Sequence, residues 1–170
     1  RDIGVTGVQT CALPISPFTL RQWGSTNTVS LSDYHGRVVV LDFFAYWCTP
    51  CQRASAELEA RVRRHYETRG HPAGVPVEVL SVNVEEGQRG RTEAFIRRNA
   101  LHRVLEDHDG ATLKAYGGRN LPFIVVVDGT RATPEKPDFR VVYRREGYEG
   151  AEKLRGVIDG IRAPGDRAAA

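Results

Sequence analysis

Long hydrophobic runs are absent from this 170-residue sequence. No apolar stretch approaches the roughly 20 residues that a helix needs to cross a bilayer, so the chain as given contains no membrane span. Lysine is also scarce, with only Lys114, Lys136 and Lys153, and the formal charge of +3 comes from scattered arginines. Because these basic residues form no cluster, we expect no nucleic-acid surface.

Cysteine is rare as well, with Cys11, Cys48 and Cys51 as its only occurrences. A structural zinc site usually needs four protein ligands, and no second Cys pair or Cys/His pair with ligand spacing follows Cys51. The histidines that could help are dispersed: His65, His71, His102 and His108. We therefore expect no metal. A permanently closed structural disulfide is the other alternative to a working Cys48/Cys51 pair.

Residues 5–15 are similar to the conceptual translation of a common short-read sequencing adapter. We therefore expect roughly residues 1–16 to be non-native read-through, with the genuine sequence beginning near Ser16 or Pro17. A real leader is the alternative, and the source DNA would distinguish the two. On this hypothesis Cys11 does not count among the protein's cysteines, and a native signal peptide or anchor is missing.

The rest of the sequence alternates strands with helices, which predicts one α/β domain over residues 17–162 and a disordered tail over residues 163–170. Residues 38–46 form a nearly continuous apolar run, typical of a strand buried on both faces. The other expected elements are a hairpin over 18–32, strands over 75–84, 103–105 and 123–128, an edge strand over 140–144, and helices over 92–99, 111–116 and 151–161.

A longer helix is expected from Cys48 to about residue 69, where Gly70 and Pro72 end it. Leu58, Val62 and Tyr66 are spaced to form one apolar stripe on this helix. The charged residues between them are expected to face solvent: Glu57, Glu59, Arg61, Arg63 and Arg64.

The Cys48/Cys51 pair lies where the buried strand gives way to this helix. Free N–H groups and the dipole of a first helical turn favour a thiolate, so we expect Cys48 to be the attacking nucleophile. Cys51 comes one turn later on the same face and is expected to be the shielded, resolving thiol. Pro50 tolerates the first turn and restricts the loop between the sulfurs.

The run Trp47-Cys48-Thr49-Pro50-Cys51 resembles the active-site segment of the thioredoxin superfamily, and residues 17–161 resemble the TlpA/ResA-like disulfide reductases. The resemblance implies a thioredoxin-like fold, with a central mixed sheet flanked by helices and a short N-terminal hairpin. It also implies a cis Leu121–Pro122 bond beside the dithiol, where the Leu121 backbone would pair with an extended substrate. Substrate-binding residues are then Trp47, Thr49, Pro50, Leu121 and Pro122.

Asp42 lies inside the apolar strand, six residues before Cys48. Desolvation there should raise its pKa and suit it to take or give a proton as Cys51 reacts. Thioredoxins carry an Asp at this position, whereas TlpA-like proteins often have a Glu shortly after the second cysteine, where this chain has Ala54. We therefore expect Asp42 to be catalytic; a buried Asp satisfied by backbone donors is the alternative.

These observations predict a monomeric thiol:disulfide oxidoreductase, a disulfide reductase that acts on protein disulfides without a bound cofactor. Thr49-Pro50 brings no His or Lys that would strongly stabilise the thiolate, which favours the reductase direction. By resemblance, the protein works in the bacterial periplasm or another extracytoplasmic space and is re-reduced by a membrane electron donor.

Two other functions remain as alternatives. A copper-binding assembly factor of related fold would use two cysteines with a histidine, but the cysteine spacing here is shorter and no His is evidently placed. A peroxiredoxin-like peroxidase normally has a lone cysteine preceded by Pro and Thr at a helix start, which this segment lacks.

Overall fold

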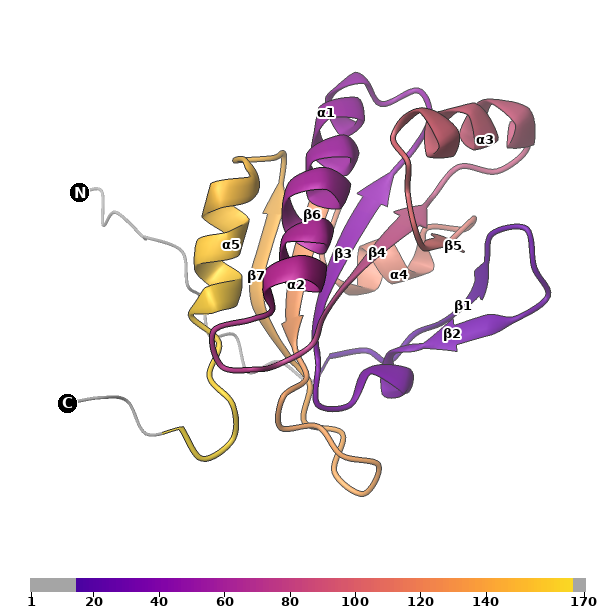
Figure 1. Ribbon diagram of the computed structural model, residues 1–170. Coiled ribbons are helices and arrows are strands. Elements are labelled where there is room, and N and C mark those ends of the chain that lie inside the picture. Colours follow the sequence, from indigo (N-terminus) through magenta and orange to yellow (C-terminus); the bar gives the residue numbers. More distant parts are fainter. Residues whose placement is uncertain (1–14, 167–170) are drawn as a thin grey trace, which may run out of the picture.

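The computed structural model describes residues 15–166. It contains a seven-stranded sheet in the order β2-β1-β5-β4-β3-β6-β7 (Figure 1). The strands are β1 (Thr19–Gln22), β2 (Thr28–Ser30), β3 (Val38–Phe44), β4 (Val77–Asn83), β5 (Val104–Glu106), β6 (Phe123–Asp128) and β7 (Arg140–Glu146). Strands β3, β4 and β5 run parallel, and the remaining pairs are antiparallel, so the sheet is mixed.

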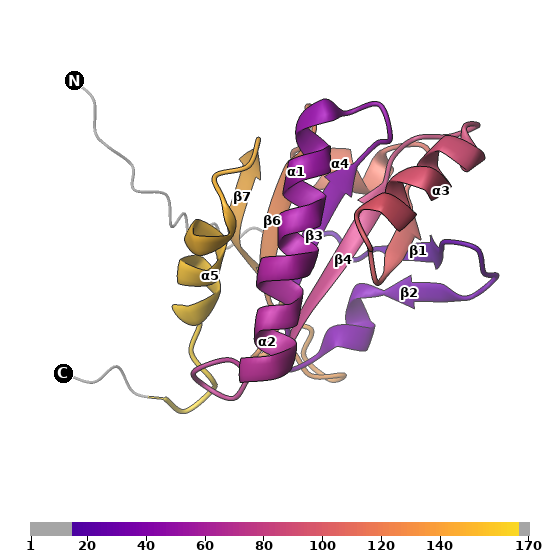
Figure 2. The same ribbon diagram turned by 45° about the horizontal axis from the view of Figure 1, so that its top comes forward.

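Helices cover both faces of this sheet. They are α1 (Thr49–Glu57), α2 (Arg64–Arg69), α3 (Arg89–Arg98), α4 (Ala111–Ala115) and α5 (Ala151–Asp159). Helices α1, α2, α3 and α5 lie on one face, and α4 lies on the other (Figures 1 and 2). The expected thioredoxin-like architecture, with its N-terminal hairpin of β1 and β2, is confirmed.

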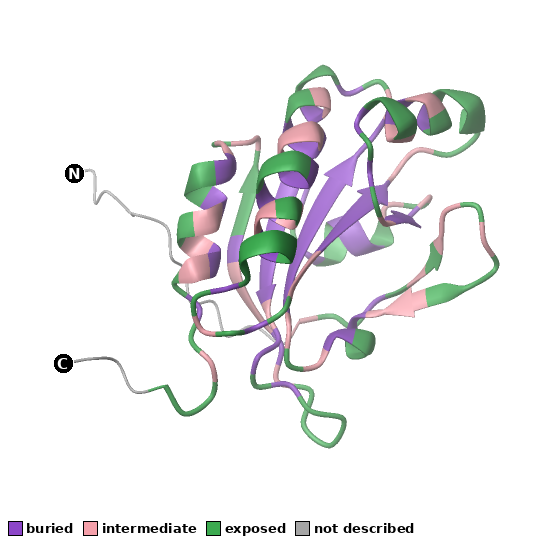
Figure 3. Cartoon of the chain, viewed as in Figure 1, coloured by how far each residue is buried: buried purple, intermediate pink, exposed green. Residues whose placement is uncertain are grey.

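Strand β3 is the centre of the core, because every one of its residues is buried. Its side chains alternate between two apolar clusters, with Val39 and Leu41 on the α4 face and Val38 and Val40 beneath residues 58–66 and α5. The central strands are coloured as buried along their length, whereas the outer surfaces of the helices are exposed (Figure 3). The continuous apolar run of the sequence therefore does mark a strand covered on both faces.

The long helix expected after Cys48 is not continuous. A π-helical segment (Leu58–Arg63) separates α1 from α2, and the Arg64 N–H donates to the Glu59 carbonyl across this wider turn. Leu58, Val62 and Tyr66 are buried as predicted. Glu59 was expected to face solvent, and this was wrong: the residue is 3% exposed. The wider turn rotates the helix face, and Arg63 one turn later forms a close ion pair with the Glu59 carboxylate.

The predicted ends of the domain lie only partly within the described residues. Residues 1–14 and 167–170 lie outside the described residues, so most of the expected non-native leader and half of the expected tail do too. Within the described part, Ile15 packs against the α4-face cluster and the Tyr116 hydroxyl donates to the Ser16 carbonyl at 3.2 Å. The domain boundaries remain predictions.

Helix α3 is attached to the sheet beside the dithiol by a stacked pair of aromatic rings. The ring centroids of Phe44 and Phe95 are 4.7 Å apart with an interplanar angle of 11°. Both side chains are essentially inaccessible to solvent, and they pack in the same cluster as Cys48 and Cys51.

We expect Phe95→Ala to lower the free energy of unfolding by about 3–4 kcal/mol, because it deletes a buried ring and leaves a cavity against Phe44. Chemical denaturation monitored by circular dichroism measures this loss. Arg98→Ala on the exposed face of the same helix is the control and should change stability by less than about 0.5 kcal/mol. Equal effects of the two substitutions would contradict the assignment of this ring pair to the core.

Candidate active site

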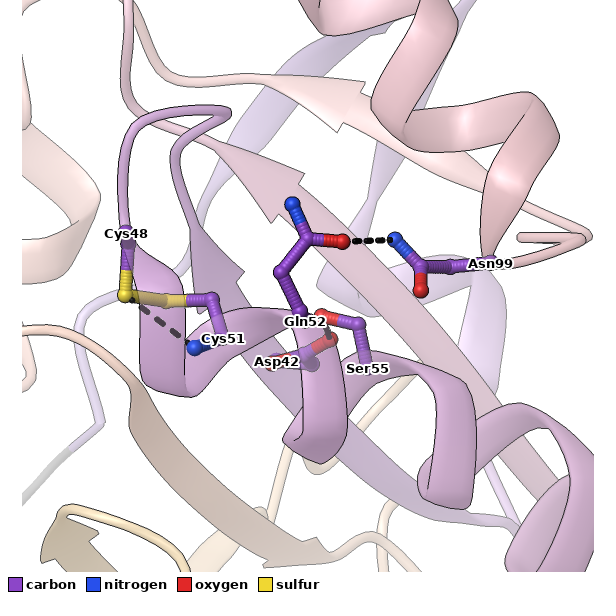
Figure 4. The surroundings of a disulfide bond; sticks show 6 residues. All are labelled: Asp42, Cys48, Cys51, Gln52, Ser55 and Asn99. Atoms are coloured by element: carbon purple, nitrogen blue, oxygen red, sulfur yellow. Dashed lines mark hydrogen bonds between the residues drawn. A yellow bond between two sulfur atoms is a disulfide. The ribbon is translucent and has the colours of Figure 1, made fainter.

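The two cysteines sit at the junction of β3 and α1 and form a disulfide with an S–S distance of 2.06 Å (Figure 4). Cys48 is the N-cap of α1, and its Sγ accepts a hydrogen bond from the Cys51 N–H at 3.3 Å. Pro50 stands in the first turn, where its missing N–H leaves no helical bond unmade. The expected strand-to-helix placement is therefore present in the structure.

Cys48 is less accessible in this oxidised form than the sequence suggested. The residue is 4% exposed and Cys51 is 0% exposed. The order of accessibility is the expected one, since only Cys48 retains surface. Its neighbours Thr49 and Pro50 are both exposed. The start of α1 next to Cys48 is therefore open to solvent, whereas Cys51 is shielded.

Trp47 is 58% exposed, unusual for so large an apolar side chain. Its indole Nε1–H donates to the Glu85 carboxylate at 2.6 Å. Asn83 at the end of β4 fixes Glu85 in turn, because its side-chain amide donates to the Glu85 carbonyl at 2.8 Å and accepts from the Glu85 N–H at 3.2 Å. Trp47 is thus a fixed, exposed aromatic surface next to Cys48.

The Leu121–Pro122 peptide bond is cis, as the resemblance implies. It comes just before β6, which pairs with β3. Leu121 is half-buried and packs against the cluster that contains Cys48 and Cys51, while Pro122 is buried. The dithiol and the cis-proline turn, about 70 residues apart in the sequence, therefore lie together at one end of the sheet.

Asp42 is completely buried beneath α1. The Ser55 hydroxyl donates to its Oδ2 at 2.6 Å, and Oδ1 has no hydrogen-bond partner among the described residues. Burial raises the pKa of Asp42 to about 7; the Ser55 hydrogen bond opposes this rise, and the Glu59 charge adds to it. The alternative of an aspartate fully satisfied by backbone donors does not apply, since its partner is a side chain and only one oxygen is bonded.

Sequence reasoning missed several side chains around the site. Ser55 was not singled out, although its position one turn after Cys51 places it on the same helix face. Asn99 after α3 donates to the Gln52 side chain at 3.2 Å and so connects α3 with the first turns of α1 (Figure 4). Such partners depend on which elements meet across the sheet, and the local pattern contains no signal for them.

Within residues 15–166, no cluster of three or more His, Cys, Asp and Glu side chains is arranged to hold a metal ion. In the same part of the chain, no helix has the length and apolar character needed to span a membrane.

Known proteins resemble this chain in sequence and in fold. Residues 13–139 match the model of the AhpC/TSA family. This chain belongs to the AhpC/TSA family. Among its relatives, this AhpC/TSA member is 33% identical to the thiol-disulfide oxidoreductase ResA of Geobacillus thermodenitrificans over 99 residues, which are 58% of this chain and 52% of that protein. ResA of Bacillus subtilis is 28% identical over 100 residues, 59% of this chain and 52% of the relative. The chain spans about half the length of these curated relatives.

Solved structures resemble this AhpC/TSA member over most of its length. A candidate DsbE-type thiol:disulfide interchange protein from Chlorobium tepidum is 26% identical with a TM-score of 0.67, covering 85% of this chain and 92% of that chain. A secreted thiol-disulfide isomerase from Corynebacterium glutamicum has a TM-score of 0.69 at 19% identity, covering 85% of this chain and 82% of the other. At that identity the second likeness shows the fold alone.

The raised pKa of Asp42 makes stability depend on pH. An unfolded Asp ionises near pH 4, whereas the folded group ionises near 7, so the folded state holds more protons between these values. The contribution of the Asp42 carboxyl to the free energy of unfolding therefore falls as the pH rises from about 4 to 7 and is constant at higher pH. Asp42→Asn removes this dependence.

We expect the unfolding free energy of Asp42→Asn, relative to the wild type, to rise by about 4 kcal/mol between pH 4 and pH 8. Urea denaturation of both proteins across this range measures it. The exposed control Asp109→Asn should show no such trend. Parallel stability curves for the wild type and Asp42→Asn would mean that Asp42 ionises normally.

Proposed function

We propose that this chain is a thiol:disulfide oxidoreductase that reduces protein disulfides through the Cys48/Cys51 pair. The observation that carries the proposal is the position of the pair: Cys48 caps α1 with its sulfur on the Cys51 N–H, beside the cis Leu121–Pro122 turn. The names of the ResA relatives support the same activity.

The reaction begins with the reduced protein. The Cys48 thiolate is stabilised by the Cys51 N–H and by the positive end of α1, so it attacks one sulfur of a substrate disulfide. A Cys48–substrate disulfide forms, and the other substrate sulfur leaves as a thiolate that takes up a proton.

Cys51 completes the exchange. Its sulfur loses a proton and attacks the Cys48 sulfur, which forms the Cys48–Cys51 disulfide seen in the structure and releases the second substrate thiolate. Two electrons pass from the dithiol to the substrate. Burial of Cys51 means that the substrate reaches Cys48 first, which fixes the order of the two attacks.

Asp42 is the group proposed to accept the Cys51 proton. It lies beneath the α1 turns that carry Cys51 and Ser55 (Figure 4). With a pKa of about 7, its carboxylate can take a proton near neutral pH and return it in the reverse reaction. Ala54 offers no carboxylate at the position where TlpA-like proteins often have one, so this chain relies on the strand aspartate.

Substrate docking is assigned to the exposed surface around Cys48. Trp47 supplies an apolar ring held by Glu85, and Thr49 and Pro50 border the sulfur. The Leu121 backbone, turned by the cis Pro122 bond, is proposed to pair with an extended substrate segment in the manner of an added strand.

We expect the Cys48/Cys51 pair to have a reduction potential of roughly −270 mV, because no His or Lys between the cysteines stabilises the thiolate further. Equilibration with glutathione or dithiothreitol buffers measures it on a protein that begins near Pro17. A value of roughly −120 mV would reverse the proposed direction and make the protein an oxidant.

Single cysteine variants test the order of attack. With a disulfide-bonded test protein, Cys51→Ser should accumulate a mixed disulfide that dithiothreitol releases, because the resolving thiol is gone. Cys48→Ser should form no adduct and lose turnover by at least about 100-fold. Cys11→Ser, the matched control, should keep full turnover. An adduct on Cys48→Ser, or cysteine-dependent consumption of hydrogen peroxide in place of disulfide reduction, would count against the proposal.

Extracytoplasmic action is part of the proposal. A secreted relative of the same fold supports it, and in such a compartment a reductase needs an electron donor. A membrane protein that re-reduces Cys48–Cys51 is the partner this implies, and the chain is proposed to act as a monomer without a bound cofactor.

A further inference from the structure

Glu146, the last residue of β7, accepts three hydrogen bonds from the segment that leads into Leu121 and Pro122. Its Oε1 accepts from the backbone N–H groups of Arg119 at 2.8 Å and of Asn120 at 3.0 Å. Its Oε2 accepts from the side-chain amide of Asn120 at 2.9 Å. The Asn120 side chain and the two backbone N–H groups hold the pKa of the Glu146 carboxyl below its usual range, so it accepts these bonds as a carboxylate at neutral pH. Consecutive backbone N–H groups aimed at one carboxylate form a compact anion site, which the chain fills with its own acid.

Glu146 lies at the same end of the sheet as the dithiol. Strand β6 is antiparallel to both β3 and β7, so β7 runs in the same direction as β3 (Figure 1). Phe123 of β6 pairs with Phe43 of β3 on one side and with Glu146 on the other. Glu146 is therefore two strand spacings, about 10 Å, from the strand that leads into Cys48.

The backbone of Leu121 remains open between two fixed neighbours. On its N-terminal side, the Asn120 N–H is held by Glu146. On its C-terminal side, the Gly147 N–H donates to the Pro122 carbonyl at 2.7 Å. Among the described residues, neither the N–H nor the carbonyl of Leu121 has a hydrogen-bond partner. Because Leu121 packs against the cluster that contains both cysteines, an open donor and an open acceptor lie next to the dithiol.

The same face of β7 makes a second contact with this loop. Arg144 comes two residues before Glu146 and so shares its face of the strand. The Arg144 guanidinium donates to the Tyr116 carbonyl at 3.4 Å. Arg145, on the opposite face, pairs with Glu149 instead. The edge strand therefore holds the loop over residues 116–120 from one of its faces.

We propose that Glu146 is a positioning residue that holds the loop before Pro122 so that the Leu121 backbone can pair with an extended polypeptide. The inference rests on the proposed function, because an open backbone beside the dithiol matters to turnover only if Cys48 exchanges with a substrate disulfide. A hydrogen bond to a backbone that is already ordered costs less to form than one to a loop that must first be ordered. The substrate class that benefits is a disulfide within a polypeptide chain, since a small disulfide has no backbone to pair with Leu121.

Two substrates separate backbone pairing from thiol chemistry. Two short peptides joined by one disulfide offer an extended backbone, whereas hydroxyethyl disulfide offers the same reactive bond and no backbone. Oxidation of the pre-reduced protein at varied substrate concentration gives KM and the maximum rate for each. We expect Glu146→Ala to raise KM for the peptide by about fivefold to tenfold and to keep the maximum rate within about twofold. The same variant should react with hydroxyethyl disulfide at the wild-type rate.

Glu146→Gln and Glu149→Ala are the matched variants. Glu146→Gln keeps an oxygen that can accept from both backbone N–H groups, so it should restore most of the affinity for the peptide. Glu149 pairs with the side chains of Tyr143 and Arg145 and not with the loop, so Glu149→Ala should leave both reactions unchanged. A general loosening of the fold in Glu146→Ala would slow both substrates. Equal losses for the peptide and the small disulfide would therefore overturn the inference.

Amide hydrogen exchange in the oxidised protein measures the contact itself. The N–H groups of Arg119 and Asn120 should exchange about tenfold faster in Glu146→Ala than in the wild type, because their acceptor is gone. The Leu121 N–H has no partner to lose and should exchange at the same rate in both proteins. Unchanged rates at Arg119 and Asn120 would show that Glu146 does not hold the loop.

The outcomes separate this inference from the proposed function. If the wild type reduces neither disulfide, the proposed function fails, and the role of Glu146 in turnover fails with it. If the wild type reduces both through Cys48 and Glu146→Ala alters neither reaction, only the role of Glu146 fails. A rise in KM confined to the peptide, together with faster exchange at Arg119 and Asn120, supports the inference.

Discussion

The packing of α1 against β3 is the constraint on which the rest of the structure depends. Strand β3 is covered on both faces, so it ends where the core ends, and α1 must begin there. That junction places Cys48 just below the surface at the helix start, Cys51 one turn further in, and Asp42 under the helix. A buried strand and a capped helix therefore place a sulfur at a helix N-terminus and a carboxyl out of reach of solvent within a single contact.

Few polar side chains are buried near this contact. Ser55 from α1 donates to Asp42 from the strand, and Arg63 pairs with the buried Glu59 further along the helix. The π-helical segment makes this possible, since its wider turn directs Glu59 inward while Leu58 and Val62 still face the core. Burial raises the pKa of Asp42 to about 7 in this layer.

Much of the fold and the centre of the site could be predicted from the sequence. The apolar run over 38–46 indicated β3, and the hairpin turn indicated β1 and β2. The spacing of Cys48 and Cys51 indicated a redox-active dithiol. These signals are local: each depends on residues that are neighbours in the chain or one helical turn apart. The cis Leu121–Pro122 bond was expected only through the resemblance to a family, because X-Pro bonds are usually trans.

The sequence by itself determined where the reactive groups lie on the predicted elements: a dithiol at a helix start and a carboxyl in the strand before it. Only the tertiary structure decided the burial of Glu59, the Ser55–Asp42 bond, the low exposure of Cys48 and the Glu85 partner of Trp47. The reason is physical. A periodic pattern tells which side of a helix is apolar, but the ionisation of a buried acid depends on the charges and donors that other elements bring near it.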